Sequence, residues 1–227
     1  GKGHYMCLFH DDGRFFKKGG KRQKPVVMTL YKTFTKDGGL TWSDPESIYA
    51  SSDIHLCEPG IIRSPDGKQL AVLLRENARR KNSHVIFSND EGKKWTAPRE
   101  LPRSLTGDRH TAKYDADGRL LIVFRAYTSR KGDFQRKDKD AKWPTEGDCA
   151  AWVGTYDDIV HNRPGKYVVR LLDNKKGYDT TYPGVEILPD GTFVVTTYGH
   201  WDEGEAPYII STRLKLKELD ALAKERG

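Results

Sequence analysis

The sequence of 227 residues contains no apolar run long enough to cross a lipid bilayer. It has only three cysteines, Cys7, Cys57 and Cys149, which cannot form a complete disulfide framework and show no metal-ligand spacing to another Cys or a His. We therefore expect three small buried thiols. A signal peptide is also lacking, and the first residue is Gly1 rather than Met, so we expect a processed or partial chain.

Acidic residues are outnumbered by basic ones, and the formal net charge is +7 at pH 7. Lysines and arginines cluster within residues 17–24, 79–81 and 136–139. Basic clusters are compatible with nucleic-acid binding, but the acidic residues near each of them favour solvated loops. We predict no nucleic-acid partner, and we expect the positive field to attract anionic substrates instead.

One motif occurs twice in the sequence, as TKDGGLTWSDP at residues 35–45 and as SNDEGKKWTAP at residues 88–98. Repetition at fixed spacing is the first sign of a repeat architecture. In each copy, the Asp is suited to accept hydrogen bonds from turn amides, the Gly to adopt an unusual φ angle, and the Trp to pack on a sheet. We interpret this motif as a structural turn between the last two strands of a repeated unit.

A second recurring signal is Asp-Gly, found in SPDGK (64–68), DADGR (115–119) and LPDGT (188–192). Asp-Gly between alternating apolar residues favours a hairpin, because Gly accepts positive φ without steric cost. Units of about 45 to 70 residues with up to four short strands are typical of a β-propeller. We predict an all-β fold of four antiparallel four-stranded blades. The first blade lacks its innermost strand, the last lacks its outermost strand, and almost no helix precedes residue 216.

The hairpins give a register for the innermost strands. Eight residues before the Asp of each hairpin stand Glu58, Arg109 and Tyr182. The ends of the second strands add Arg75 and Arg125, with His10 and Tyr198 as counterparts in the first and last blades. We expect all of these side chains to converge on one mouth of the central channel, with Asp11 beside His10 at its rim.

The repeated motif, the strand pattern and these positions together resemble the sialidase (neuraminidase) superfamily of six-bladed propellers, whose Asp-box, or BNR repeat, is similar to residues 35–42 and 88–95. CEPGIIRSPDGKQLAVLLREN (57–77) resembles the blade that carries the glutamate partner of the nucleophile and an arginine of the carboxylate-binding triad. TTYPGVEILPDGTFVVTTYG (180–199) is similar to the nucleophile blade, and YIISTRLKLKELD (208–220) to the closing strand. The resemblance implies that residues 1–227 form the C-terminal part of a sialidase-like propeller domain whose N-terminal blades are missing.

The resemblance also implies a function, that of a retaining exo-α-sialidase without a cofactor or metal. Tyr182 would be the nucleophile, Glu58 its base and Arg75 a carboxylate ligand. Arg109, Arg125, His10 and Asp11 would be further substrate contacts. A neutral phenol suits this role, because the anomeric carbon of sialic acid carries a carboxylate that repels an anionic nucleophile. The expected partners are sialylated or other acidic glycans, and the expected location is secreted or periplasmic.

Two departures from the family pattern leave alternatives open. The first arginine and the Asp acid/base of the family lie in a blade that this chain lacks, so the acid is not identified. The region expected to carry the third arginine reads EGDCAAWVGTY (146–156) and has none. Arg109 and Arg125 are the candidates to replace it. The alternatives are a propeller that acts on another acidic sugar and a non-catalytic glycan-binding propeller.

Overall fold

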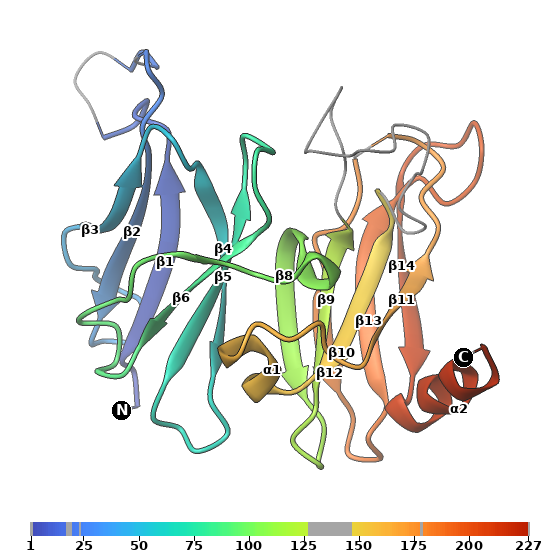
Figure 1. Cartoon of the computed structure of the whole chain (residues 1–227). Helices are drawn as coiled ribbons and strands as arrows, with labels where there is room; N and C mark the ends of the chain where they lie inside the picture. The colour runs from blue at the N-terminus through green and yellow to red at the C-terminus, as the bar shows by residue number, and fades with distance from the viewer. Residues whose placement is uncertain (1, 17–19, 23, 127–146, 178, 227) are drawn as a thin grey trace.

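The structure is a computed structural model that describes residues 2–16, 20–22, 24–126, 147–177 and 179–226. These residues form four antiparallel sheets that stand side by side, each a blade of a partial β-propeller (Figure 1). The first blade consists of β1 (Tyr5–Asp11), β2 (Met28–Thr35) and β3 (Glu46–Ser51). The second consists of β4 (Leu56–Arg63), β5 (Leu70–Glu76), β6 (His84–Ser88) and β7 (Arg99–Glu100).

The third blade consists of β8 (Gly107–Tyr114), β9 (Leu120–Ala126), β10 (Cys149–Gly154) and β11 (Tyr167–Leu172). The fourth consists of β12 (Gly184–Ile187), β13 (Phe193–Gly199) and β14 (Tyr208–Leu214), and α2 (Leu216–Arg226) follows it. The two outer blades have three strands, as expected. The first lacks the innermost strand and the last lacks the outermost strand of the four-stranded pattern.

The hydrophobic core lies between the blades rather than within one of them. Strand β9 is buried on both faces: Leu120, Ile122 and Phe124 pack toward the second blade, whereas Leu121 and Val123 pack toward the fourth. Successive side chains of a strand point to opposite faces, so a strand between two neighbours needs a continuous apolar sequence. Each large side chain buried in this way contributes about 1.5 to 3 kcal/mol.

The repeated motif forms the same turn twice, between β2 and β3 and between β6 and β7. In the second copy, the Lys94 N–H donates to Asp90 at 2.8 Å, the Gly92 N–H donates to the Ser88 hydroxyl at 2.9 Å, and the Trp95 indole donates to the Gly92 carbonyl at 3.1 Å. The first copy repeats these bonds through Thr41, Gly39 and Trp42. The structural interpretation of the motif is therefore confirmed.

Among the described residues before 216, helix appears at two positions, where the sequence predicts almost none. A 3-10 turn covers Arg103–Leu105, and α1 covers Tyr156–Val160. The start of α1 is a capping box in which the Thr155 hydroxyl accepts from the Asp158 N–H while the Asp158 carboxylate accepts from the Thr155 N–H. The sequence Thr-x-x-Asp is the local signal that identifies this helix.

Two expectations about individual side chains are wrong. Cys7 is exposed, because it lies on the edge strand β1, whereas Cys57 and Cys149 are buried. Arg79 is buried in an ion pair, although its cluster reads as a solvated loop; only Arg80 and Lys81 of that cluster face solvent. The basic residues 136–139 lie outside the described residues.

Candidate active site at the mouth of the inner strands

The innermost strands carry bulges at the positions that the hairpin register selects. In β4, Cys57 pairs with Arg75 and Gly60 with Leu73, so Glu58 and Pro59 lie opposite a single residue. In β8, Asp108 pairs with Arg125 and Thr111 with Val123, so Arg109 and His110 form the same bulge. Bulges of this kind redirect side chains and occur often beside active sites.

The backbone at these bulges is in an unfavourable conformation. Glu58 has φ of 49° and Arg109 has φ of 62°, and in the last blade Thr181, directly before Tyr182, has φ of 62°. A non-glycine residue with positive φ costs on the order of 1 to 3 kcal/mol, and such strain clusters at functional sites. Tyr182 occupies the equivalent bulge, because the Thr181 N–H still bonds the Tyr198 carbonyl at 3.0 Å while Gly184 pairs with Thr196.

The inner strands approach each other closely beside these bulges. A Cβ atom added to Gly60 would lie only 2.2 Å from the carbonyl oxygen of His110, so only glycine fits there. Strand β8 contacts both β4 and β12, which places Arg109 between Glu58 and Tyr182. These three residues line one cavity of about 320 Å³.

Arg109 links the other two residues of this cavity. Its guanidinium carbon lies 3.4 Å from the centroid of the Tyr182 ring, a cation–π contact, and its Nε lies 3.7 Å from Glu58 Oε1. Its Nη1 donates to the Thr180 carbonyl at 2.6 Å, which fixes the guanidinium in this position. Tyr182 remains 58% exposed at the mouth.

Glu58 is held by Arg75, whose Nη1 donates to Glu58 Oε1 at 2.7 Å. The other oxygen, Oε2, is buried and has no hydrogen-bond partner among the described residues. If Glu58 is the base for Tyr182, the Tyr182 phenol is expected to donate a direct hydrogen bond to this carboxylate. This bond is absent among the described residues, because the Arg109 guanidinium lies over the Tyr182 ring and beside Glu58. The two side chains nevertheless face the same cavity.

Asp108 organises the arginines behind this cavity and was missed by the sequence analysis. Its fully buried carboxylate accepts two 2.6 Å hydrogen bonds from Arg79 and further bonds from Arg125, and Arg75 Nε lies 3.3 Å away. Burial opposes ionisation of Asp108, but the Arg79 hydrogen bonds and the charges of Arg79, Arg75 and Arg125 outweigh it and hold the pKa of this carboxyl well below its usual range. Arg125 is buried in this ion pair, so it supports the site from behind.

His10 and Asp11 reach the same region from the end of β1. The Glu58 N–H donates to His10 Nδ1 at 3.3 Å, and partial enclosure lowers the pKa of the imidazole. The two oxygens of Asp11 accept the backbone N–H groups of Gly13 at 2.9 Å and Phe15 at 3.2 Å, so they hold the loop after β1. Except for Arg125, which is buried behind the cavity, the predicted residues thus lie around one mouth, and their roles stay predictions.

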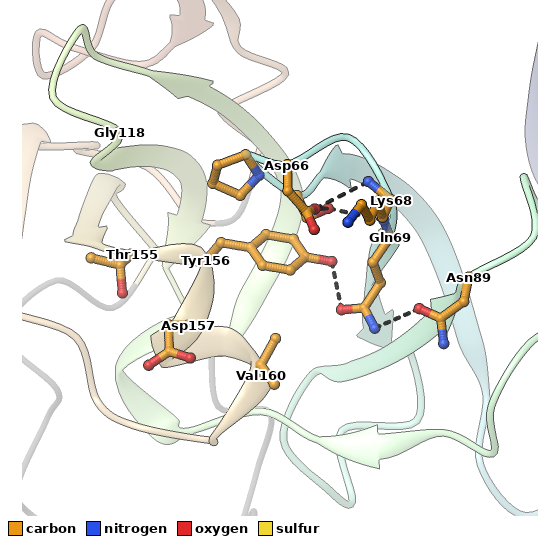
Figure 2. Close-up of a pocket in the computed structure, with 11 residues that line it drawn as sticks. Asp66, Lys68, Gln69, Asn89, Gly118, Thr155, Tyr156, Asp157 and Val160 are labelled. Atoms are coloured by element: carbon orange, nitrogen blue, oxygen red, sulfur yellow. Dashed lines mark hydrogen bonds between the residues drawn. The ribbon is translucent and has the colours of Figure 1, made fainter.

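A larger cavity, of about 500 Å³, lies at the opposite ends of the inner strands, beside the hairpin of the second blade and α1 (Figure 2). The Tyr156 hydroxyl points to Gln69, to which it donates at 3.0 Å, and Gln69 donates to Asn89 at 2.8 Å. These polar groups satisfy one another. We therefore interpret this cavity as a space left where the second blade packs against the third, and not as a binding site.

Within the described residues, no helix is long and apolar enough to span a membrane, and no group of three or more His, Cys, Asp or Glu side chains is arranged to hold a metal ion.

No protein-family model and no curated protein sequence matches this chain. Solved structures do match it. A protein of unknown function from Dyadobacter fermentans is 18% identical, with a TM-score of 0.69 over 94% of this chain and 50% of that one. The intramolecular trans-sialidase from Ruminococcus gnavus is 16% identical, with a TM-score of 0.54 over 86% of this chain and 41% of that one.

CoXyl43, a β-xylosidase/α-arabinofuranosidase from a compost microbial metagenome, is 9% identical, with a TM-score of 0.57 over 95% of this chain and 68% of that one. This chain therefore spans about half the length of the Dyadobacter protein and less than half of the trans-sialidase. At these identities, the likeness establishes a shared fold: the chain is part of a β-propeller of the architecture that these glycosidases also use.

Proposed function

We propose that the chain carries the active site of a retaining glycoside hydrolase that removes a terminal acidic sugar, with sialic acid as the first candidate. The observation that carries the proposal is the position of Arg109, which contacts Glu58 on one side and the ring of Tyr182 on the other. A base, a phenol and a cation thus share one cavity at strained bulges. The trans-sialidase among the structural neighbours supports this choice of sugar.

The arginines that reach the cavity favour an anionic substrate. Among the described residues, Arg75 and Arg109 contact Glu58, and Arg75, Arg79 and Arg125 contact Asp108. The side chains of Arg79 and Arg125 are each 6% exposed, whereas those of Arg75 and Arg109 are 12% and 13% exposed. A guanidinium binds a carboxylate through two parallel hydrogen bonds and stays charged at all relevant pH values. We therefore assign the substrate carboxylate to Arg109, with Arg75 behind it.

The reaction consumes one water molecule and breaks one glycosidic C–O bond. The Tyr182 oxygen attacks the anomeric carbon while Glu58 Oε2, which accepts no hydrogen bond from the part of the chain that the structure describes, takes the phenolic proton. The bond to the leaving oxygen breaks, and that oxygen gains a proton from an acid. Water then attacks the same carbon and gives up a proton to the conjugate base of that acid, the bond to Tyr182 breaks, and the proton on Glu58 returns to the phenolate.

Binding must come before the proton transfer. Arg109 covers the face of Tyr182, and a substrate carboxylate that pairs with Arg109 would draw its guanidinium away. The phenol and Glu58 could then approach to the 2.5 to 3.0 Å of a typical O–H···O hydrogen bond. We propose that this rearrangement couples recognition of the acidic group to activation of the nucleophile.

A second candidate is a glycan-binding propeller without turnover. The stacking of Arg109 on Tyr182 favours it, because a cation on an aromatic ring is a stable binding surface and blocks the phenol. Another acidic sugar in place of sialic acid is the third possibility. The same cavity would serve all three functions, and only measurement of turnover separates them.

The test compares fluorogenic glycosides on the intact protein. We expect release of the fluorophore from an α-sialoside and none from a β-xyloside or β-galactoside. Tyr182→Phe should abolish most turnover, whereas the matched variant Tyr198→Phe should retain it. Tyr198 stacks beside Tyr182 with ring centroids 6.2 Å apart, but its hydroxyl is bound to Asp179 at 2.7 Å. Equal activity of the two variants, or turnover of the neutral glycosides alone, would contradict the proposal.

A further inference from the structure

The bulge of the last blade differs from the other two in one backbone angle. In the second and third blades, the residue with positive φ is the one whose side chain lines the cavity: Glu58 has φ of 49° and Arg109 has φ of 62°. In the last blade, the residue with positive φ is Thr181, at 62°, and the cavity is lined by the next residue, Tyr182. Among these three bulges, only this one places the left-handed residue directly before the functional side chain.

This shift accounts for the different exposure of the three side chains. Those of Glu58 and Arg109 are 17% and 13% exposed, whereas Tyr182 is 58% exposed. A left-handed residue within a bulge changes the direction of the chain and redirects the side chain that follows it. With the left-handed residue at Thr181, the Tyr182 ring is directed outward to the mouth of the cavity, where the Arg109 guanidinium carbon lies 3.4 Å from the ring centroid.

Thr181 is an unexpected residue for a left-handed backbone. A β-branched side chain at positive φ is sterically unfavourable, and such a conformation persists only where the surroundings hold it. Thr181 is fully buried and its polar groups are engaged. Its N–H donates to the Tyr198 carbonyl at 3.0 Å, its carbonyl accepts from Arg109 Nη1 at 3.2 Å, and its hydroxyl lies 3.2 Å from the Thr180 hydroxyl. These contacts hold the backbone in place.

The surroundings of the Thr181 hydroxyl are closely packed as well. Its neighbour, Thr180 Oγ1, donates to the Tyr198 carbonyl at 2.9 Å. A Cβ atom added to Gly199 would lie 2.4 Å from Thr180 Oγ1, so this glycine leaves the space that the pair of hydroxyls needs. Burial raises the pKa of the Cys149 thiol to about 12, and a hydrogen bond with the Thr181 side chain opposes this rise. The hydroxyl thus also contacts the third blade, in which Cys149 begins β10.

We propose that Thr181 is a positioning residue for Tyr182: its buried hydroxyl holds the left-handed backbone that directs the phenol to the mouth of the cavity. The direction of the phenol is independent of any activity, whereas its use in the reaction rests on the proposed function. Thr181 also supports the Arg109 guanidinium through its carbonyl. A catalytic group displaced by about 1 Å can lose on the order of 10²-fold in rate, so Thr181 would act on turnover without touching the substrate.

Two variants of the intact protein separate the hydroxyl from the shape of the side chain. Thr181→Val keeps the branched Cβ, and with it the steric cost of positive φ, but removes the hydroxyl. We expect its backbone to leave the left-handed region and the phenol to turn inward, where the side chains of Glu58 and Arg109 lie. Thr181→Ser keeps the hydroxyl and should preserve the direction of the phenol. Thr197→Val is the matched control, because Thr197 is buried in the same blade and its hydroxyl has no hydrogen-bond partner among the described residues.

Nitration by tetranitromethane, followed by peptide mass spectrometry, reports the accessibility of each phenol without a substrate. We expect the nitration of Tyr182 relative to Tyr198 to fall in Thr181→Val and to stay unchanged in Thr181→Ser and Thr197→Val. With a fluorogenic α-sialoside, kcat should fall more than about tenfold in Thr181→Val alone, with a smaller change in KM. A merely structural role would lower the melting temperature of Thr181→Val and leave the nitration ratio and kcat unchanged.

An unchanged nitration ratio in Thr181→Val, or an equal decrease in Thr197→Val, would overturn the proposal. A lower ratio with an unchanged kcat would also overturn it, because turnover would then not depend on the direction of the Tyr182 phenol. If neither the unsubstituted protein nor any variant hydrolyses the sialoside, the proposed function fails. A decrease of the ratio confined to Thr181→Val would in that case still support the positioning of the phenol by Thr181.

Discussion

Replacing Asp108 with Asn is the sharpest perturbation of the arginine cluster. The substitution keeps the shape of the side chain and removes its charge. Asp108 is fully buried, accepts both Nη groups of Arg79 at 2.6 Å, and also bonds Arg125. An asparagine offers one acceptor oxygen and places an N–H₂ donor against guanidinia that are themselves only donors. At least two buried cations, Arg79 and Arg125, would therefore lose the negative charge of Asp108.

The expected cost follows from this burial. Removing one partner of a buried ion pair costs about 3 to 5 kcal/mol, because the remaining charge is left without compensation. A domain has a total stability of about 5 to 15 kcal/mol, so the variant would lose a large share of it. For 150 to 250 residues, each kcal/mol moves the melting temperature by about 2 to 4 °C, which predicts a decrease of roughly 6 to 20 °C.

Urea unfolding followed by circular dichroism measures this loss, and Glu91→Gln is the matched control. Glu91 also forms a bidentate ion pair, in which Arg63 Nη1 and Nη2 donate to its two carboxylate oxygens at 2.6 and 2.7 Å, but that pair is exposed. An exposed pair contributes about 0.2 to 1 kcal/mol. If Asp108→Asn lowers the unfolding free energy no more than Glu91→Gln does, solvent screens the arginine cluster. The argument that the buried arginines form an anion-binding site is then refuted.

Three further predictions follow from the same contacts. The folded-state pKa of Asp108 lies below its unfolded value of about 3.9, so its ionised carboxylate stabilises the fold above pH 3.9 or so, and this stabilisation is lost as the pH falls below that value. The unfolding free energy of Asp108→Asn should therefore change less with pH in this acidic range than that of the unsubstituted protein. Asp90→Ala, which removes the acceptor for the Ser88 hydroxyl and the Lys94 N–H, should lower the melting temperature in thermal unfolding, and an unchanged melting temperature would contradict the structural role of the motif. Glu58→Gln should lower kcat about 10²-fold with an unchanged circular dichroism spectrum, as expected for loss of a general base; a decrease of less than tenfold would exclude that role.

Local sequence signals predicted the blades because hairpins and box turns are specified by neighbouring residues. Asp-Gly fixes a turn and thereby the register, so the shared bulge positions of Glu58, Arg109 and Tyr182 can be counted from the sequence alone. Asp108 and Arg79 could not be found in this way. They are 29 residues apart in the sequence and meet only through the packing of the third blade on the second. Arg79 has the same sequence signature as its exposed neighbour Arg80.

The sequence register also could not predict the placement of Arg109. Counting positions places a residue at a bulge, but the direction of a long side chain depends on what surrounds it. Here the Thr180 carbonyl, 71 residues away in the sequence, accepts from Arg109 and turns the guanidinium over Tyr182. For this reason the expected hydrogen bond between the Tyr182 phenol and the Glu58 carboxylate does not form, although both residues lie at the bulge positions that the register predicts.

The most direct test of the central claim is covalent trapping of the nucleophile. A sialic acid analogue with fluorine beside the anomeric carbon and fluoride as leaving group would transfer its sugar to the attacking oxygen and leave it slowly, because the fluorine destabilises the oxocarbenium-like transition state. Peptide mass spectrometry of the intact protein should then find the added sugar on Tyr182, and Tyr182→Phe should remain unlabelled. Label on another residue, or none in a protein that hydrolyses sialosides, would contradict the assignment of Tyr182 as the nucleophile.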